Sequence, residues 1–278
     1  MDVSFKQCDS QLSQALSIAL PFSFILLGEA LLFAGDLGNC AIVHLLNILI
    51  CILVPILLRL DSLIWQSFSL LSILRVLNLA MPAFNELTVL WMPLIYAPII
   101  LAGFLLIRDE TRGPIDYIRD LAHFFDYSRS AKGWKIYYLP LALVLALFVA
   151  NIEFKVLSLT MSDLRMIPEL SWSYLGLLFI VMVFLVGLGE ELVFRYILQT
   201  RLQASVGIIP ALLITSAAFS LMHSGYTSLI YMVYVFGVSL MFGLLFYKTN
   251  SLAFVSLLHG TLNFFLFSIL PFGYLVLF

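Results

Sequence analysis

Charged residues are scarce in this sequence of 278 residues: Asp, Glu, Lys and Arg together make up 11% of it, against roughly 25% in soluble domains. Hydrophobic residues make up 63%, and the mean hydropathy is +1.09. This composition predicts a membrane protein whose chemistry takes place within or beside the bilayer. The formal net charge of −2, with no long basic stretch, gives no indication of a nucleic-acid partner.

Cysteine is equally rare. The three cysteines, Cys8, Cys40 and Cys51, lie in the first fifth of the chain and form no Cys-x-x-Cys pair. We therefore expect neither a disulfide framework nor a cysteine-based zinc site, and we interpret all three as small packing residues. The N-terminus also lacks the basic start and the small-residue cleavage pattern of a signal peptide, so the first apolar run is expected to be a retained span.

Long apolar runs fill most of the remaining sequence. A helix needs about 20 apolar residues to cross a bilayer. Eight windows of that kind occur, at about 15–35, 41–60, 87–107, 136–155, 173–198, 208–223, 227–247 and 252–270. A ninth, at about 63–84, contains Gln66, Arg75 and Asn78, and it is expected either to cross or to lie in the interface. Because lipid admits only helices and closed barrels, the predicted fold class is all-α, a polytopic transmembrane helical bundle with eight or nine spans.

One polar stretch, 108–135, follows the run at 87–107 and holds six of the 14 Lys and Arg residues. Its apolar residues recur at helical spacing after Pro114, which predicts an amphipathic helix on the membrane surface. If all nine runs cross, ten Lys and Arg fall on one side and only Lys155 and Arg165 on the other. The positive-inside rule then places the N-terminus and the 108–135 loop in the cytoplasm. If 63–84 does not cross, the N-terminus moves to the other side. Residues 1–278 are expected to form a single membrane domain.

The segment VGLGEELVFRYIL, residues 186–198, places two adjacent glutamates and an arginine at the end of an apolar run. A charged side chain at mid-bilayer costs at least about 2.5 kcal/mol on insertion scales, so these residues need partners or water. On a helix, Glu191 and Arg195 share a face, whereas Glu190 points about 100° away and has no partner in its own helix. Arg195 can hold Glu191 ionised, which leaves Glu190 as a candidate general base. A structural polar network between helices is the alternative interpretation.

Two later runs carry further polar pairs. LLITSAAFSLMHSG places Phe219 and His223 four residues apart, and SLLHGTLNFFLF does the same for His259 and Asn263. A lone histidine on an apolar helix is more often a packing residue, but two histidines and an asparagine downstream of a glutamate pair favour a shared site. Three other polar residues of the apolar runs have no motif partner and are interpreted as packing or structural residues: His44, Glu29 and Glu153.

These motifs together resemble the CPBP family of membrane proteases. That family includes the CAAX endopeptidases, which trim prenylated proteins, and bacteriocin-processing and immunity proteins. EELVFR matches its E-E-x-x-x-R motif, FSLMH its F-x-x-x-H motif and HGTLN its H-x-x-x-N motif, in the same order. The resemblance covers residues 174–267, about a third of the chain, and marks this segment as the motif-bearing catalytic core.

The resemblance implies an intramembrane endopeptidase that uses no metal. It implies roles for six residues: activation of a water by Glu190 and His223, hydrogen bonding to the oxyanion by His259 and Asn263, and orientation of the site by Glu191 and Arg195. The implied substrate is a peptide or a lipidated protein in contact with membrane lipids, such as the C-terminal tail of a prenylated, CAAX-type protein.

Two alternatives stay open. Glu190, His223 and His259 could form a three-ligand zinc site, although the chain has no His-Glu-x-x-His motif. The protein could instead be a non-proteolytic transporter, or a binding or immunity protein that keeps the motif residues as a polar core; no inverted repeat marks a transporter. In each case we expect the 208–223 helix to be short and the 173–200 helix to be long and tilted around a water-filled cavity. Otherwise His223 and His259 would lie at different depths.

Overall fold

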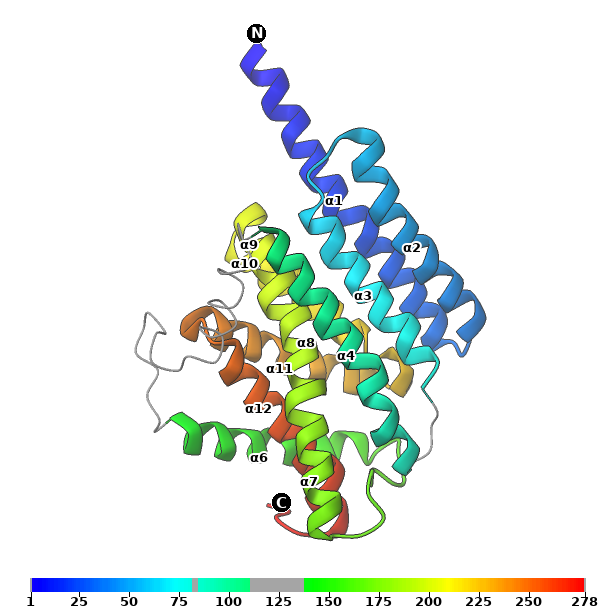
Figure 1. Ribbon diagram of the computed structural model, residues 1–278, viewed down its shortest axis with the longest axis vertical. Helices are drawn as coiled ribbons and strands as arrows, with labels where there is room; N and C mark the ends of the chain where they lie inside the picture. Colours follow the sequence, from blue (N-terminus) through cyan, green and yellow to red (C-terminus); the bar gives the residue numbers. More distant parts are fainter. Residues whose placement is uncertain (1, 82–84, 111–137, 278) are drawn as a thin grey trace.

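The computed structural model describes residues 2–81, 85–110 and 138–277 (Figure 1). These described residues form helices and no strand, which confirms the all-α fold class. The surface segment expected at 108–135 lies outside the described residues from position 111 onward, and its first three residues end the helix before it.

Every apolar window of the sequence forms a helix. Apart from one long helix described next, the helices in chain order are α1 (Asp2–Phe33), α2 (Leu37–Leu58), α3 (Leu63–Leu79), α4 (Asn85–Glu110), α6 (Tyr138–Leu157), α10 (Ile208–Leu221), α11 (Leu229–Thr249) and α12 (Leu252–Phe264). Between α6 and α10, one continuous helix runs through residues 172–206, and we call it the long helix. It consists of α7 (Trp172–Ile180), a π-helical stretch (Val181–Gly187), α8 (Leu188–Glu191), a second π-helical stretch (Leu192–Gln199) and α9 (Thr200–Val206).

Seven helices of the described residues are long and apolar enough to cross a membrane, which supports an integral membrane protein. The other two windows form shorter helices, α3 with 17 residues and α10 with 14. At 1.5 Å per residue, α10 is about 21 Å long, less than the roughly 30 Å of the hydrocarbon core. The expectation of a short 208–223 helix beside a long one is thereby confirmed, since the long helix has 35 residues.

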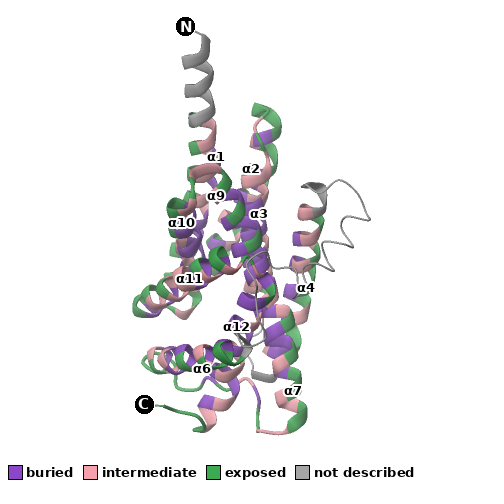
Figure 2. Cartoon of the chain, turned by 90° about the vertical axis from the view of Figure 1, so that its left-hand side faces the viewer, coloured by how far each residue is buried: buried purple, intermediate pink, exposed green. Residues whose placement is uncertain are grey.

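The helices are arranged around the long helix. Helices α1, α2 and α3 run side by side at one end of the molecule, and α3 joins them to α4 and to the long helix (Figure 1). Helix α4 packs along the long helix on one side, and α12 packs against it as well. Helix α6 runs across the direction of the long helix in both views and packs on α12 (Figures 1 and 2). The long helix thus contacts α3, α4 and α12, which come from different parts of the chain.

Burial separates the central helices from those that face outward. In the long helix and α12, 61% and 72% of the apolar window is buried, against 22% in α2. Leucines along α2, such as Leu45, Leu49 and Leu53, are exposed. Apolar side chains on such a face are solvated by lipid in a membrane. The polar side chains of the long helix and α12 are thus kept away from lipid.

Two glycines bring the long helix and α12 into backbone contact. A Cβ atom on Gly187 would lie 2.7 Å from the carbonyl oxygen of Ser256, and one on Gly260 would lie 2.6 Å from that of Met182. Small residues allow membrane helices to approach this closely. Because Gly260 directly follows His259, the contact fixes the depth at which His259 faces the long helix.

Candidate active site

The two glutamates have different surroundings. They lie in α8, between the two π-helical stretches, and such stretches are frequent at functional sites. Glu191 is fully buried beside the equally buried Arg195, with 3.1 Å between its Oε2 and the arginine Nε. Glu190 instead lines a cavity with a side chain that is 13% exposed, and its Oε1 accepts a hydrogen bond of 2.6 Å from the Tyr96 hydroxyl on α4. Only Glu190 is therefore accessible to a substrate or a water.

His259 on α12 contacts both glutamates. Its Nδ1 lies 2.8 Å from Oε1 of Glu191, and its Nε2 lies 3.7 Å from Oε2 of Glu190. The first distance is that of a hydrogen bond to a carboxylate, in which Nδ1 is the donor, whereas the second is too long for a hydrogen bond. Since Glu191 uses its other oxygen for Arg195, it holds the arginine and the imidazole at once. Glu191 thereby fixes the orientation of the His259 ring.

His223 follows the last turn of α10. Its Nδ1 lies 2.9 Å from the carbonyl oxygen of Phe219, one helical turn earlier. Because a carbonyl oxygen can only accept, Nδ1 carries the proton in this contact, and Nε2 of the neutral ring is left as an acceptor. The ring stacks on Tyr226 at 6.2 Å and meets Tyr231 edge-on at 5.9 Å between centroids. Aromatic neighbours and a backbone hydrogen bond therefore fix both its tautomer and its orientation.

Phe219, the first residue of the F-x-x-x-H motif, fills the space between the other motif side chains. Its ring centroid lies 4.9 Å from Cζ of Arg195 and 5.8 Å from the centroid of His259. A cation over an aromatic face gains about 2 kcal/mol where both groups are desolvated. Phe219 thus stabilises the buried arginine and separates the Glu191–Arg195 pair from the cavity side.

A cavity of about 600 Å³ opens beside these side chains. It is lined by all four residues that the sequence predicts to be catalytic: Glu190, His223, His259 and Asn263. It is also lined by six of the nine methionines of the chain: Met81, Met92, Met161, Met166, Met182 and Met222. Methionine is flexible and polarizable, so such walls adapt to irregular apolar shapes. The cavity combines acidic, imidazole and amide groups with an adaptable apolar surface.

Three residues that form hydrogen bonds in this cavity lie outside the motifs found in the sequence. Besides Tyr96, they are Glu153 on α6 and Tyr231 on α11, whose hydroxyl donates a hydrogen bond of 2.7 Å to the Glu153 carboxylate. A single tyrosine in an apolar run is common, because its ring packs while its hydroxyl finds a polar partner. Each partner lies on a different helix, so no spacing along the chain could reveal these contacts.

His44, which the sequence analysis interprets as a packing residue, is buried and has polar partners on other helices. Both of its ring nitrogens contact polar side chains: Nε2 lies 3.3 Å from Glu29 Oε1, and Nδ1 lies 3.2 Å from the Ser72 hydroxyl. The sequence search looked for a partner at helical spacing on the same helix, but Glu29 lies on α1 and Ser72 on α3. His44 belongs to a polar cluster between three helices.

The alternative of a zinc site finds no support in the geometry. Among the described residues, no group of three or more His, Cys, Asp or Glu side chains has the arrangement needed to hold a metal ion. The three ligands considered for zinc, Glu190, His223 and His259, do not form such a group. His259 also has one ring nitrogen engaged by Glu191.

A comparison with known protein families finds a match to the part of the chain that contains the motifs. The model of a family described as Type II CAAX prenyl endopeptidase Rce1-like matches residues 172–265. The match begins with the long helix, contains all three motifs, and leaves α1 to α4 and α6 outside. It confirms the resemblance to the CAAX-protease family over this third of the chain, and it supports a CAAX-type membrane protease at the level of the family. No curated protein and no solved structure matches the chain.

Proposed function

We propose that this protein is an intramembrane endopeptidase that hydrolyses a peptide bond with a water activated by Glu190 and His223. The observation that carries the proposal is the convergence of a carboxylate, two imidazoles and an amide on one cavity, within a segment matched by a CAAX endopeptidase family. These groups come from three separate parts of the chain. Packing alone does not require ionisable groups to meet in a cavity, whereas acid–base chemistry does.

The proposed reaction is a direct attack by water. Glu190 accepts a proton from the water while the water oxygen adds to the carbonyl carbon of the peptide bond. The C–N bond then breaks, and the proton passes to the leaving nitrogen, so that the products are an amine and a carboxylic acid, which then ionises. His223, whose Nδ1 is engaged by the Phe219 carbonyl, presents Nε2 as a second acceptor for the water or for the transferred proton.

His259 and Asn263 are proposed to bind the oxyanion. An asparagine amide donates without a change of protonation. His259 donates from Nε2 only when both ring nitrogens carry protons, a form for which Glu190 and Glu191 supply counter-charges. Donors of this kind contribute about 3–4 kcal/mol each in other oxyanion holes. Glu191 and Arg195 touch no substrate in this scheme and act by orienting His259.

The proposed substrate is the C-terminal tail of a prenylated protein. The family match supports this class. The six methionines of the cavity wall support it independently, since a long flexible apolar chain next to the cleaved bond needs an adaptable apolar surface. A prenyl group would also concentrate the substrate at the membrane in which the cavity lies.

A matched pair of peptides tests the proposal. The purified protein is incubated with peptides that share one C-terminal sequence and differ only in prenylation of the cysteine, and cleavage is measured by mass spectrometry. We expect cleavage of the prenylated peptide, a much lower rate for the other, and no cleavage by Glu190→Gln. Equal cleavage of both would contradict the substrate class. Absence of any cleavage, together with solute flux in liposomes, would replace the peptidase by a transporter.

A further inference from the structure

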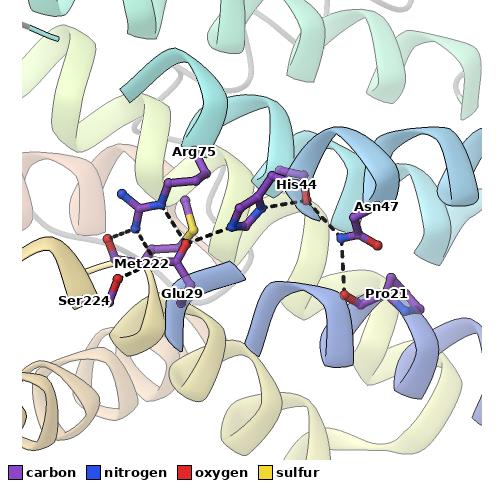
Figure 3. Close-up of polar contacts among 8 residues, drawn as sticks. Pro21, Glu29, His44, Asn47, Arg75, Met222 and Ser224 are labelled. Carbon is purple, nitrogen blue, oxygen red and sulfur yellow. Dashed lines mark hydrogen bonds and ion pairs between the residues drawn. The ribbon is translucent and has the colours of Figure 1, made fainter. Parts of the chain in front are cut away.

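A buried polar cluster lies outside the matched region and next to the proposed active site (Figure 3). Arg75 on α3 binds the Glu29 carboxylate on α1 through two hydrogen bonds, of 2.6 Å from Nε and 2.8 Å from Nη2. His44 on α2 contacts the same carboxylate and continues to Ser72, which accepts a hydrogen bond of 2.9 Å from Asn47. All five side chains are buried. We call them the Glu29 cluster.

The Glu29 cluster reaches the turn that carries His223, on both sides of that residue. On one side, Nη2 of Arg75 donates a hydrogen bond to the carbonyl oxygen of Met222. On the other side, the Ser224 hydroxyl donates to Oε2 of Glu29, at 2.5 Å. In Figure 3, Arg75 and Glu29 lie against Met222 and Ser224 at one end of the cluster, while Asn47 and Pro21 lie at the other. The backbone of His223 is thus held between two buried charged groups.

Electrostatics at the end of α10 favours this contact. Met222 is the residue that caps α10, where carbonyl groups have no partner within the helix. A guanidinium at a helix C-terminus satisfies such a carbonyl and interacts favourably with the helix dipole. Beyond it, the chain makes only one short turn, Ser224–Tyr226, before Thr227 adopts a left-handed conformation with φ +50°. The contacts with Arg75 and Glu29 therefore add to the local hydrogen bonds that hold His223.

Simple packing does not explain the Glu29–Arg75 pair. Burying an ion pair carries a desolvation penalty that apolar residues of the same volume avoid, so such a pair is weak evidence for stability alone. Here Nη2 of Arg75 and Oε2 of Glu29, which bond each other, also form hydrogen bonds with Met222 and Ser224. We propose that Glu29 and Arg75 are positioning residues, which hold His223 at the place where it acts on the water. The inference rests on the proposed peptidase function and gives the three N-terminal helices a part in it.

Two serine substitutions give a matched test. Ser224→Ala removes the hydroxyl that ties the turn to Glu29, whereas Ser72→Ala removes an equally buried hydroxyl at the other end of the cluster. Ser224 does not line the cavity, so its loss should leave KM unchanged. We expect Ser224→Ala to lower kcat roughly tenfold and Arg75→Met roughly 100-fold, since small displacements of catalytic groups cost up to that much. Ser72→Ala should keep kcat within a factor of about two. Equal losses for the two serine variants would overturn the proposal.

A double-mutant comparison separates positioning from stability. If Ser224 acts through His223, Ser224→Ala should have no further effect on kcat in the His223→Ala background. A loss that simply adds to that of His223→Ala would overturn the proposal. Arg201→Met is the control for removal of a buried arginine, because Arg201 binds the Leu63 carbonyl at 2.7 Å, away from this turn. It should lower the melting temperature and leave kcat within about twofold.

Amide hydrogen exchange tests the contact without any substrate. In Ser224→Ala and Arg75→Met, exchange at residues 222–227 should become faster while that of α12 stays the same. Unchanged exchange at the turn would overturn the inference even if the enzyme is active. If the unaltered protein cleaves no peptide, the proposed function fails, and faster exchange at the turn in the variants would still support the contact itself.

Discussion

Replacement of Glu190 and of Glu191 by glutamine should affect stability differently, although the two residues are neighbours. Glu191 is fully buried and makes two charged contacts, at 3.1 Å to Arg195 and at 2.8 Å to His259. Removing its charge leaves the guanidinium buried without a counter-ion, a defect that costs about 3–5 kcal/mol in buried pairs. We therefore expect Glu191→Gln to lower the melting temperature markedly and to lower the rate as well.

Glu190→Gln removes the proposed base and little else. The hydrogen bond that Glu190 accepts from Tyr96 can still be accepted by the amide oxygen of glutamine, and the side chain borders the cavity. The expected change in the free energy of unfolding is below about 1.5 kcal/mol, the usual value of one hydrogen bond. Loss of a general base lowers kcat by about 10²- to 10⁴-fold. Glu190→Gln should thus lower the cleavage rate strongly and the free energy of unfolding only slightly.

The assay compares both variants with the unaltered protein in the same detergent, by melting temperature and by peptide cleavage. Glu190→Gln should be stable and nearly inactive, and Glu191→Gln should be unstable. If Glu190→Gln cleaves at the normal rate while Glu191→Gln is stable and inactive, the roles assigned to the two glutamates are the wrong way round.

Three further predictions follow from other parts of the molecule. Cleavage should persist after exhaustive chelation, because the site is proposed to activate water without a metal; loss of activity that Zn²⁺ restores would contradict this. Gly260→Ala should destabilise the protein by about 1–3 kcal/mol and slow cleavage, because its Cβ would press on the long helix, whereas Gly176→Ala meets no atom within 4 Å and should do neither. Single cysteines placed near the N-terminus and in 108–135 of a cysteine-free variant should react only with reagents added from the cytoplasmic side; labelling from the other side would reverse the predicted orientation.

The sequence predicts those features that depend on spacing within one helix. Helix periodicity alone places Glu191 next to Arg195 and separates Glu190 from both, and the structure has this arrangement. The apolar windows likewise locate the nine apolar helices of the described residues, because burial in lipid requires continuous runs. The sequence does not give the length of each helix. Residues 63–84 form one long apolar window, but α3 ends at Leu79.

The spacing of residues within one helix cannot predict contacts between helices. The hydrogen bond from His259 to Glu191 joins residues 68 positions apart, and it depends on the backbone contact made by Gly187 and Gly260. The same holds for His44, whose partners lie on two other helices. A search at helical spacing could not find either contact.

The most direct test of the central claim is cleavage of a prenylated peptide by the purified protein in liposomes, compared with Glu190→Gln and with Glu169→Gln. Glu169 is an exposed glutamate in the segment before the long helix, so its replacement controls for the loss of a carboxylate. We predict that the unaltered protein and Glu169→Gln cleave the peptide at similar rates and that Glu190→Gln releases no product. Cleavage by Glu190→Gln at the rate of the unaltered protein would contradict the proposal that Glu190 activates the water.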